Sequence, residues 1–409
     1  MTNYNALIII SNTAQIEMFK RIISNLKDFN IKFVNTEIFQ IKEEIENYLT
    51  KYELNYINIS DWSMKSVQKI LRSENPDIIL SGHDQSPMDI LFIKTGNEMN
   101  IPSLTVQDGL LAAVRFVNET VNSKVEYFFK MLYRFFKLFF NPYRTFNYKI
   151  SRLRFELEYG RDYNYNYGHG ESSKIALFGD NTRNLLVSEG VPAEKLVVTG
   201  SSKFDDLLEF KNPVKQKLLR EKYGISSKRK VVLVLTAWFV EAGLWTAEDR
   251  RFFITEIAKA CNNLGDVQLV IKLHAPHENI KDYQEILEDY PGSPLIFEFE
   301  SLHELICISD VVVSVSSTAA LEAMAIDKPV LIVNMDHGSK IFKDSGALFI
   351  ERTDSFESAL EKLLFHTKEF VDRKRMQDFV YDQAYLVDGK ASVRISDLIR
   401  SMVSEYIKF

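Results

Sequence analysis

The chain has 409 residues, of which 46% are hydrophobic and 26% are charged, and its formal net charge is −6. This length and composition predict a globular protein with room for two domains, and the acidic balance excludes the global basic field typical of nucleic-acid binding. Two cysteines are too few for a disulfide framework, and no apolar run reaches the ~18 residues of a membrane-spanning helix, so we expect a cytoplasmic protein.

The beginning of the chain has the pattern of a doubly wound sheet. Residues 6–10 are an apolar run that predicts a strand, and residues 11–13 predict a turn. Apolar residues then recur at helical spacing as far as residue 26, and residues 31–34 predict a second strand. The turn lacks the glycines of a dinucleotide fingerprint, so we predict no cofactor there.

Titratable residues follow two further predicted strands of the first half. Residues 77–80 are followed by His83 and Asp84, and residues 102–106 are followed by Asp108. Neighbouring parallel strands bring such residues into one crevice, where His83 or Asp108 could act as the general base for a hydroxyl nucleophile. Each residue alone could be a helix cap or a surface histidine, but three of them at two strand ends favour a functional site.

Residues 122–154 interrupt the alternation of strands and helices. Eleven aromatic residues lie between positions 127 and 148, and positions 124–154 hold eight Lys or Arg residues against one acid. Apolar bulk with basic residues on the polar face is typical of a helix that lies in a membrane interface.

We therefore predict that this segment docks on an anionic membrane surface at the inner face of the cell membrane. Its basic contacts would be Lys130, Arg134 and Lys137, and the side chains entering the acyl boundary would be Phe128, Phe135 and Phe139. Two alternatives are a helical insertion packed within the domain and a contact with a second subunit in a homodimer. Nucleic-acid binding by the same residues is a third alternative, which the overall acidity disfavours.

The second half opens after a charged helix and linker over residues 211–230. Residues 231–235 predict a buried strand, and Thr236 stands at its carboxyl end, where open α/β sheets bind phosphate-bearing ligands. A further strand over residues 267–273 leads to His274.

A metal site is one alternative for the residues after this strand. His274, His277 and Glu278 are metal-ligating types, but the signal is weak without a further distant ligand, so we predict no metal site.

A hydroxyl-rich turn follows the predicted strand at residues 311–315. Ser316, Ser317 and Thr318 precede a helix of strong helix formers, in which Glu322 stands one turn further on. Hydroxyls and free N–H groups at a helix N-terminus favour an anion, so we predict a phosphate site. The simpler alternative is a helix cap without a ligand.

These stretches resemble the GT-B glycosyltransferase superfamily. The most similar branch holds bacterial capsule and surface-polysaccharide transferases, CDP-glycerol glycerophosphotransferases and non-hydrolysing UDP-sugar 2-epimerases. The resemblance implies that the Ser-Ser-Thr turn holds the donor diphosphate and that Glu322 lies near the nucleotide ribose. It also implies that His274 contacts donor phosphate or acts as an acid toward the leaving group, although Ala275 replaces the usual proline.

The resemblance extends to three other motifs. Residues 190–205 resemble the end of the first domain, with Ser201, Ser202 and Lys203 in variable slots that would contact substrate. Asp108 takes the slot of the proposed base in a Gln-His-Gly motif, before Gly109, so either Asp108 or His83 would be the base. Residues 388–392 resemble an element that precedes a terminal helix packing back toward the first domain.

We therefore predict an α/β protein of two doubly wound, Rossmann-like domains that face each other across a cleft, with an inserted amphipathic segment. An acceptor-binding domain would cover residues 1–210, including the insertion at 122–154, and a linker would cover 211–230. A donor-binding domain would cover 231–387, and residues 388–409 would form the returning helix.

The expected activity is metal-independent transfer of a sugar from a nucleotide sugar to a glycan or lipid-linked acceptor in surface-polysaccharide synthesis. The nucleotide-activated donor would be a substrate, and no other cofactor is expected. Alternatives are a CDP-glycerol-type glycerophosphotransferase, a UDP-sugar 2-epimerase and a non-catalytic protein that binds sugar nucleotides at the membrane. The sequence names neither the donor nucleotide and sugar nor the acceptor, linkage, stereochemical course and oligomeric state.

Overall fold

The first domain is organised around a parallel sheet. The computed structural model describes residues 4–37, 41–111, 139, 146–158, 166–274, 278–335 and 338–407. Within these residues the first sheet has seven strands in the order β3-β2-β1-β4-β5-β6-β7, and each neighbouring pair is parallel. The strands are β1 (Tyr4–Ile10), β2 (Phe29–Asn35), β3 (Tyr56–Asn58), β4 (Ile78–Ser81), β5 (Ser103–Val106), β6 (Lys174–Leu177) and β7 (Leu196–Val198).

The second domain repeats this arrangement. Among the described residues its sheet has six parallel strands in the order β10-β9-β8-β11-β12-β13. They are β8 (Lys230–Leu235), β9 (Val267–Lys272), β10 (Leu295–Phe297), β11 (Val311–Ser314), β12 (Val330–Asn334) and β13 (Leu348–Glu351). The strand order reverses between β1 and β4 in the first sheet and between β8 and β11 in the second, and open α/β sheets bind ligands at such points. The prediction of two doubly wound domains is confirmed.

Each face of the first sheet has its own core, because alternate residues of a strand point to opposite faces. Ile8 and Ile10 of β1 pack with α1 (Thr13–Ile23), α2 (Lys42–Lys51) and α16 (Ala391–Ile407), whereas Leu7 and Ile9 pack with α3 (Met64–Glu74) and α4 (Pro87–Glu98). A strand buried on both faces reads as a continuous apolar run, which is why β1 and β8 were recognisable in the sequence.

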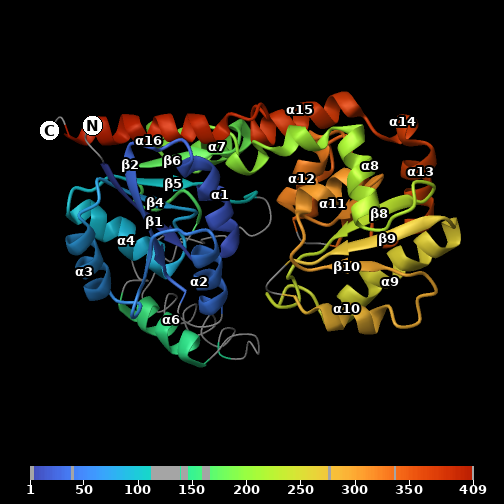
Figure 1. The fold of residues 1–409 in the computed structure, drawn as a ribbon, viewed down its shortest axis with the longest axis horizontal. Helices are drawn as coiled ribbons and strands as arrows, with labels where there is room; N and C mark the ends of the chain where they lie inside the picture. The colour runs from blue at the N-terminus through green and yellow to red at the C-terminus, as the bar shows by residue number, and fades with distance from the viewer. Residues whose placement is uncertain are drawn as a thin grey trace.

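Helices cover the sheets of both domains (Figure 1). Those that lie with the first sheet are α1 (Thr13–Ile23), α2 (Lys42–Lys51), α3 (Met64–Glu74), α4 (Pro87–Glu98), α6 (Phe146–Glu158) and α7 (Asp180–Ser188). Those that lie with the second are α8 (Pro213–Lys222), α9 (Ala247–Leu264), α10 (Ile280–Ile286), α11 (Leu302–Ile308), α12 (Thr318–Ala325), α13 (Phe356–Phe365) and α14 (Thr367–Phe370).

The chain returns to the first domain through α15 (Arg373–Ala384) and α16 (Ala391–Ile407), which run along one side of both domains (Figure 1). The carboxylate of Asp205 accepts hydrogen bonds from the N–H groups of Ala391 and Ser392, each over 2.8 Å, and so caps α16. The apolar face of α16 then joins the core of the first domain. A β-carbon on Gly179 would lie 2.5 Å from the carbonyl oxygen of Asp382. A glycine at position 179 therefore lets the end of α15 approach the first domain more closely than any other residue there would allow.

Part of the predicted membrane segment lies outside the described residues, namely Phe128, Lys130, Arg134, Phe135 and Lys137. Phe139 and α6 are described. None of the described helices combines the length and hydropathy that crossing a bilayer requires.

Candidate functional site

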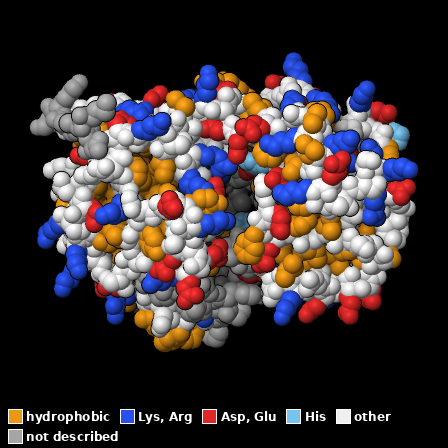
Figure 2. Space-filling model, viewed as in Figure 1, with side chains coloured by type: hydrophobic (Ala, Val, Ile, Leu, Met, Phe, Trp, Pro, Cys, Tyr) orange, Lys and Arg blue, Asp and Glu red, His pale blue; other side chains and the backbone are white. Residues whose placement is uncertain are grey.

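The loop after β5 touches the beginning of α12 across the boundary between the domains. The backbone N–H of Leu110 donates a hydrogen bond to Thr318 Oγ1 over 3.1 Å, and a β-carbon on Gly109 would lie 3.7 Å from the same oxygen. The loop that carries Asp108 is therefore docked on the predicted phosphate site. Figure 2 shows the surface hollowed along the line where the two domains meet.

Asp108 is held from two sides. Gln15 Nε2 donates to Asp108 Oδ2 over 3.2 Å, and Lys203 Nζ donates to the Asp108 carbonyl oxygen over 2.6 Å. Gln15 is itself fixed, since its Oε1 accepts from the N–H of Ser11 over 2.9 Å. A β-carbon on Gly82 would lie 2.6 Å from Gln15 Nε2, so a glycine leaves the space that this amide needs.

Sequence reasoning missed Gln15 and Gln107 as supports of this loop. Gln107 is 1% exposed; its Nε2 donates to the Gly109 carbonyl over 2.8 Å, and its Oε1 accepts from the Phe178 N–H over 2.8 Å. One signal in the sequence could have identified Gln15. It is a polar residue in the first turn of α1, directly after β1, and the strand order of the sheet reverses beside β1.

His83 is charged rather than basic at neutral pH. Its Nδ1 lies 2.8 Å from Asp89 Oδ2. Burial opposes the charge on His83, but Asp89, with Asp108 and Asp84, raises its pKa to about 10. A histidine that already carries its proton cannot accept one, so this pKa shift disfavours His83 as general base and leaves Asp108 as the candidate.

Asp84 contacts backbone rather than solvent. It is fully buried, and its carboxylate accepts hydrogen bonds from the N–H groups of Gly168 and Gly170 at 3.0 to 3.2 Å. Burial raises its pKa, against the lowering effect of these backbone donors. Asp84 therefore anchors the 168–170 loop to the end of β4, which is a structural position.

The segment that crosses between the domains runs from β7 to α8. The three residues of it that were predicted to contact substrate, Ser201, Ser202 and Lys203, have different surroundings. Ser202 Oγ donates to the Met18 carbonyl oxygen over 3.2 Å, which ties the segment to α1, and Ser201 is buried beside it. Lys203 alone reaches the Asp108 loop. The structure thus brings Lys203 to the candidate site, whereas Ser202 is bonded to α1 and Ser201 is buried.

The opposite wall of the cleft is built around Glu278. This residue is 2% exposed and accepts hydrogen bonds from the hydroxyls of Thr236 and Tyr283 and, over 2.7 Å, from the backbone N–H of His274. Arg250 Nη2 lies 4.0 Å away. Thr236 Oγ1 also accepts from the His274 N–H over 3.2 Å, so the predicted Thr236 and His274 belong to one bonded cluster.

His274 is neutral at physiological pH. The residue is exposed, yet the surrounding protein removes enough water from the imidazole that desolvation lowers its pKa to about 4, with Lys272 and Lys203 contributing in the same direction. His274 can therefore form a hydrogen bond with a phosphate without bringing a charge. In the part of the chain that the structure describes, which omits His277, no cluster of His, Cys, Asp and Glu is suited to a metal ion.

The hydroxyls at the start of α12 have separate partners. Ser317 caps the helix by accepting the Ala319 N–H over 3.1 Å, and Thr318 accepts the Leu110 N–H. Ser316 lines a small cavity between the ends of β8 and β11, together with Thr236 and Ser314. The capping role that the sequence allowed is thus present, and a capping hydroxyl that accepts an N–H still has its own hydrogen to donate to a phosphate.

We expect that replacing Ser317 and Thr318 together by alanine weakens binding of UDP by at most a few kcal/mol, since a hydrogen bond to a charged group contributes about 1.5–3 kcal/mol. Titration calorimetry measures this directly. Ser355→Ala is the matched control, because Ser355 caps α13 in the same way, over 3.2 Å to the Ser358 N–H. Unchanged affinity in the double variant would contradict the phosphate site.

Part of the chain matches the sequence model of a known protein family. The family is described as UDP-N-acetylglucosamine 2-epimerase, and the match covers residues 173–400. A processive diacylglycerol beta-glucosyltransferase of Bacillus thuringiensis (strain Al Hakam) is 22% identical over 221 residues, which are 52% of this chain and 54% of that protein. The chain spans about half the length of the curated relatives it matches.

Solved structures share the whole fold. UDP-GlcNAc 2-epimerase from Neisseria meningitidis, bound to UDP-GlcNAc, has a TM-score of 0.60 at 16% identity, over 97% of this chain and 100% of that one. The wall teichoic acid polymerase TagF has a TM-score of 0.59 at 12% identity, over 100% of this chain and 90% of that one. At these identities the likeness establishes the two-domain GT-B fold alone.

Proposed function

The chain belongs to the UDP-N-acetylglucosamine 2-epimerase family, and from this premise we propose that it binds a nucleotide-activated sugar and transfers the sugar to an acceptor hydroxyl. The observation that carries the proposal is the contact between Leu110 and Thr318, because it sets the Asp108 loop against the beginning of α12. A proton acceptor next to an anion-binding helix terminus is what transfer from a sugar diphosphate requires.

The proposed reaction assigns one role to each side of the cleft. The donor diphosphate would lie at the N-terminus of α12, where Ser317 and Thr318 donate hydrogen bonds and the helix dipole offsets the charge of the leaving group. Neutral His274 would hydrogen-bond the same phosphates. Asp108 would accept the proton of the acceptor hydroxyl as the new glycosidic bond forms and the bond between the sugar and the diphosphate breaks. Protonated His83 would keep the crevice from excess negative charge. This scheme needs no metal ion.

A UDP-sugar 2-epimerase is the second candidate, because the family match over residues 173–400 carries that description. Epimerisation also needs a base beside the sugar and a site for the diphosphate, so the same residues would serve. It differs in needing no acceptor.

The test is to follow UDP-GlcNAc by NMR with purified protein, with and without a lipid extract that contains acceptor. Release of UDP that depends on the extract supports transfer, whereas conversion to the C2 epimer without extract supports epimerisation. If UDP binds in calorimetry but neither product forms with any of the UDP-, CDP- and GDP-sugars, the catalytic proposal fails.

The exposed face of α6 suggests where the acceptor comes from. Phe146 and Leu157 are each more than 60% exposed and, with Ile150, lie within a narrow stripe at helical spacing, whereas Phe155 is buried in the first domain. Three basic residues, Lys149, Arg152 and Arg154, stand on the same helix. We propose that α6 and the basic segment before it dock the protein on an anionic membrane, which would present a lipid-linked acceptor to the first domain.

We expect the protein to co-sediment with vesicles that contain anionic lipid, and to be released as salt screens the basic residues. Changing Phe146 and Leu157 to serine should reduce the bound fraction several-fold, because the stripe would no longer enter the acyl boundary. Val214 and Leu218, a comparably exposed pair on α8, supply the control substitutions. A protein that stays in the supernatant with every lipid contradicts the membrane proposal and favours a soluble acceptor.

A further inference from the structure

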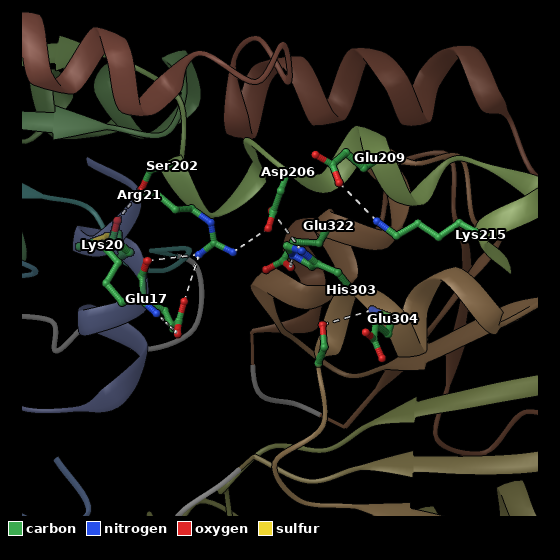
Figure 3. A network of polar contacts seen from close by, with 12 residues as sticks. Glu17, Lys20, Arg21, Ser202, Asp206, Glu209, Lys215, His303, Glu304 and Glu322 are labelled. Carbon is green, nitrogen blue, oxygen red and sulfur yellow. Dashed lines mark hydrogen bonds and ion pairs between the residues drawn. The ribbon is translucent and has the colours of Figure 1, made fainter. Parts of the chain in front are cut away.

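Four side chains of alternating charge run from the first domain to the nucleotide-binding helix (Figure 3). Arg21 Nη2 on α1 lies 3.0 Å from Asp206 Oδ2, in the segment that crosses between the domains. Asp206 Oδ1 lies 3.3 Å from His303 Nδ1 on α11, and His303 Nε2 lies 2.8 Å from Glu322 Oε2 on α12. One connected path therefore joins α1 to the acid predicted to lie near the ribose.

His303 can pair with both of its neighbours when it is doubly protonated. A neutral imidazole donates from one nitrogen, but here each nitrogen faces a carboxylate. The side chain is buried, and its ring packs on Phe210 with ring centres 5.5 Å apart. Burial disfavours the charge, yet Asp206 and Glu322 outweigh it and raise the pKa of His303 to about 9.

The other charged groups around this path pair among themselves. On α1, Glu17 accepts from Lys20 and lies near Arg21. The remaining pairs are Glu209 of η4 (Leu207–Phe210) with Lys215 of α8, and Glu304 of α11 with Lys222 of α8. Among the described residues, the charges that face His303 directly are therefore Asp206 and Glu322.

We propose that His303 positions Glu322 for the nucleotide and ties that position to the docking of the first domain through Asp206 and Arg21. The inference rests on the proposed function, and it also takes Glu322 as a contact of the donor nucleotide, as the GT-B resemblance implies. His303 is a positioning residue in this scheme, since it acts on the ligand through Glu322.

The path links the docking of the first domain to the position of Glu322, which would otherwise be independent of each other. Asp206 lies next to the 3-10 turn in which Ser202 is bonded to α1, so it moves with the first domain as well as with the crossing segment. If the domains separate, His303 loses Asp206 and with it part of the support for its charge. Glu322, 5% exposed, would then lose the donor that fixes one of its oxygens.

The sign of the pH dependence follows from this arrangement. The pKa of His303 is about 9 in the folded protein, above the ~6.5 of an unfolded chain. The contribution of its charge is therefore fully present below pH ~6.5 and is lost as the pH rises through about 9. We expect UDP affinity to fall about tenfold across the same upper range, because the hydrogen bond from His303 to Glu322 loses its charge.

The experiment is titration calorimetry of the full chain with UDP from pH 6 to pH 10. His303→Gln should bind about tenfold more weakly at neutral pH and lack the fall near pH 9, since the amide does not titrate. His366→Gln is the matched control, because His366 is an exposed histidine of the same domain that lies 4.0 Å from Glu369. It should bind UDP as the unchanged protein does.

Asp206→Asn is a second and milder variant, since Asp206 is partly exposed. It keeps the shape but removes a charge that supports protonated His303, so the fall in affinity should move to lower pH. If His303 is purely structural, the fall in UDP affinity occurs at the same pH in Asp206→Asn as in the unchanged protein, and this result overturns the proposal. An unchanged pH profile in His303→Gln overturns it as well. If the unchanged protein binds no UDP at any pH, the proposed function has failed instead.

Discussion

Changing Asp108 to asparagine is expected to reduce kcat about 10²–10⁴-fold while the affinity for the donor nucleotide stays near normal. Asparagine keeps the shape and the contact with Gln15 Nε2, but it cannot accept the proton of an acceptor hydroxyl. The donor would bind on the other domain, so its affinity has no direct dependence on this carboxylate. Steady-state kinetics with calorimetry of UDP binding separates the two effects.

The control for Asp108 is Asp61→Asn, which changes a first-domain carboxylate that accepts from Ser66 over 2.9 Å. It should leave turnover unchanged. His83→Ala is the informative comparison, because protonated His83 is assigned a supporting role. Turnover that survives Asp108→Asn and disappears in His83→Ala would reverse the two assignments.

Changing Glu278 to alanine should destabilise the second domain by about 3–5 kcal/mol, the usual cost of removing one partner from a buried charged network. The Thr236 and Tyr283 hydroxyls and the His274 N–H would lose their common acceptor inside the protein. We also expect donor affinity to fall, because the same contacts hold Thr236 and His274 in place. Urea denaturation followed by a probe in the second domain, with UDP titration of the folded variant, measures both.

Glu278→Gln retains an oxygen acceptor and should cost clearly less than alanine, whereas Glu285→Ala, at an exposed site on the neighbouring helix α10, should cost almost nothing. A Glu278→Ala protein as stable as the Glu285→Ala control would show that the network contributes no net stability.

The fold and the positions of the strand-end residues were predictable from the sequence because both depend on local patterns. Continuous apolar runs marked β1 and β8, and the residues that follow parallel strands necessarily share an edge of the sheet. Thr236, His274 and Thr318 could therefore be assigned to one cleft from their places in the chain.

The partners of these residues could not be predicted, because they come from distant parts of the chain. Gln15 and Asp108 are 93 residues apart, and the environment that protonates His83 depends on how α4 presents Asp89. His303 was not identified at all, since a lone histidine in an amphipathic helix carries no signal until both of its carboxylate neighbours are in place.

The return of α16 to the first domain sets an order for assembly during synthesis. Ile395, Ile399, Met402 and Val403 complete one face of the core that β1 begins, and Ser396 donates a hydrogen bond to the carbonyl of Ile22, 374 residues earlier. The ribosome therefore releases the strands of the first domain well before the helix that covers them, and finishes the second domain in between. The domain made first is completed last, and until then its apolar face is open to other nascent chains.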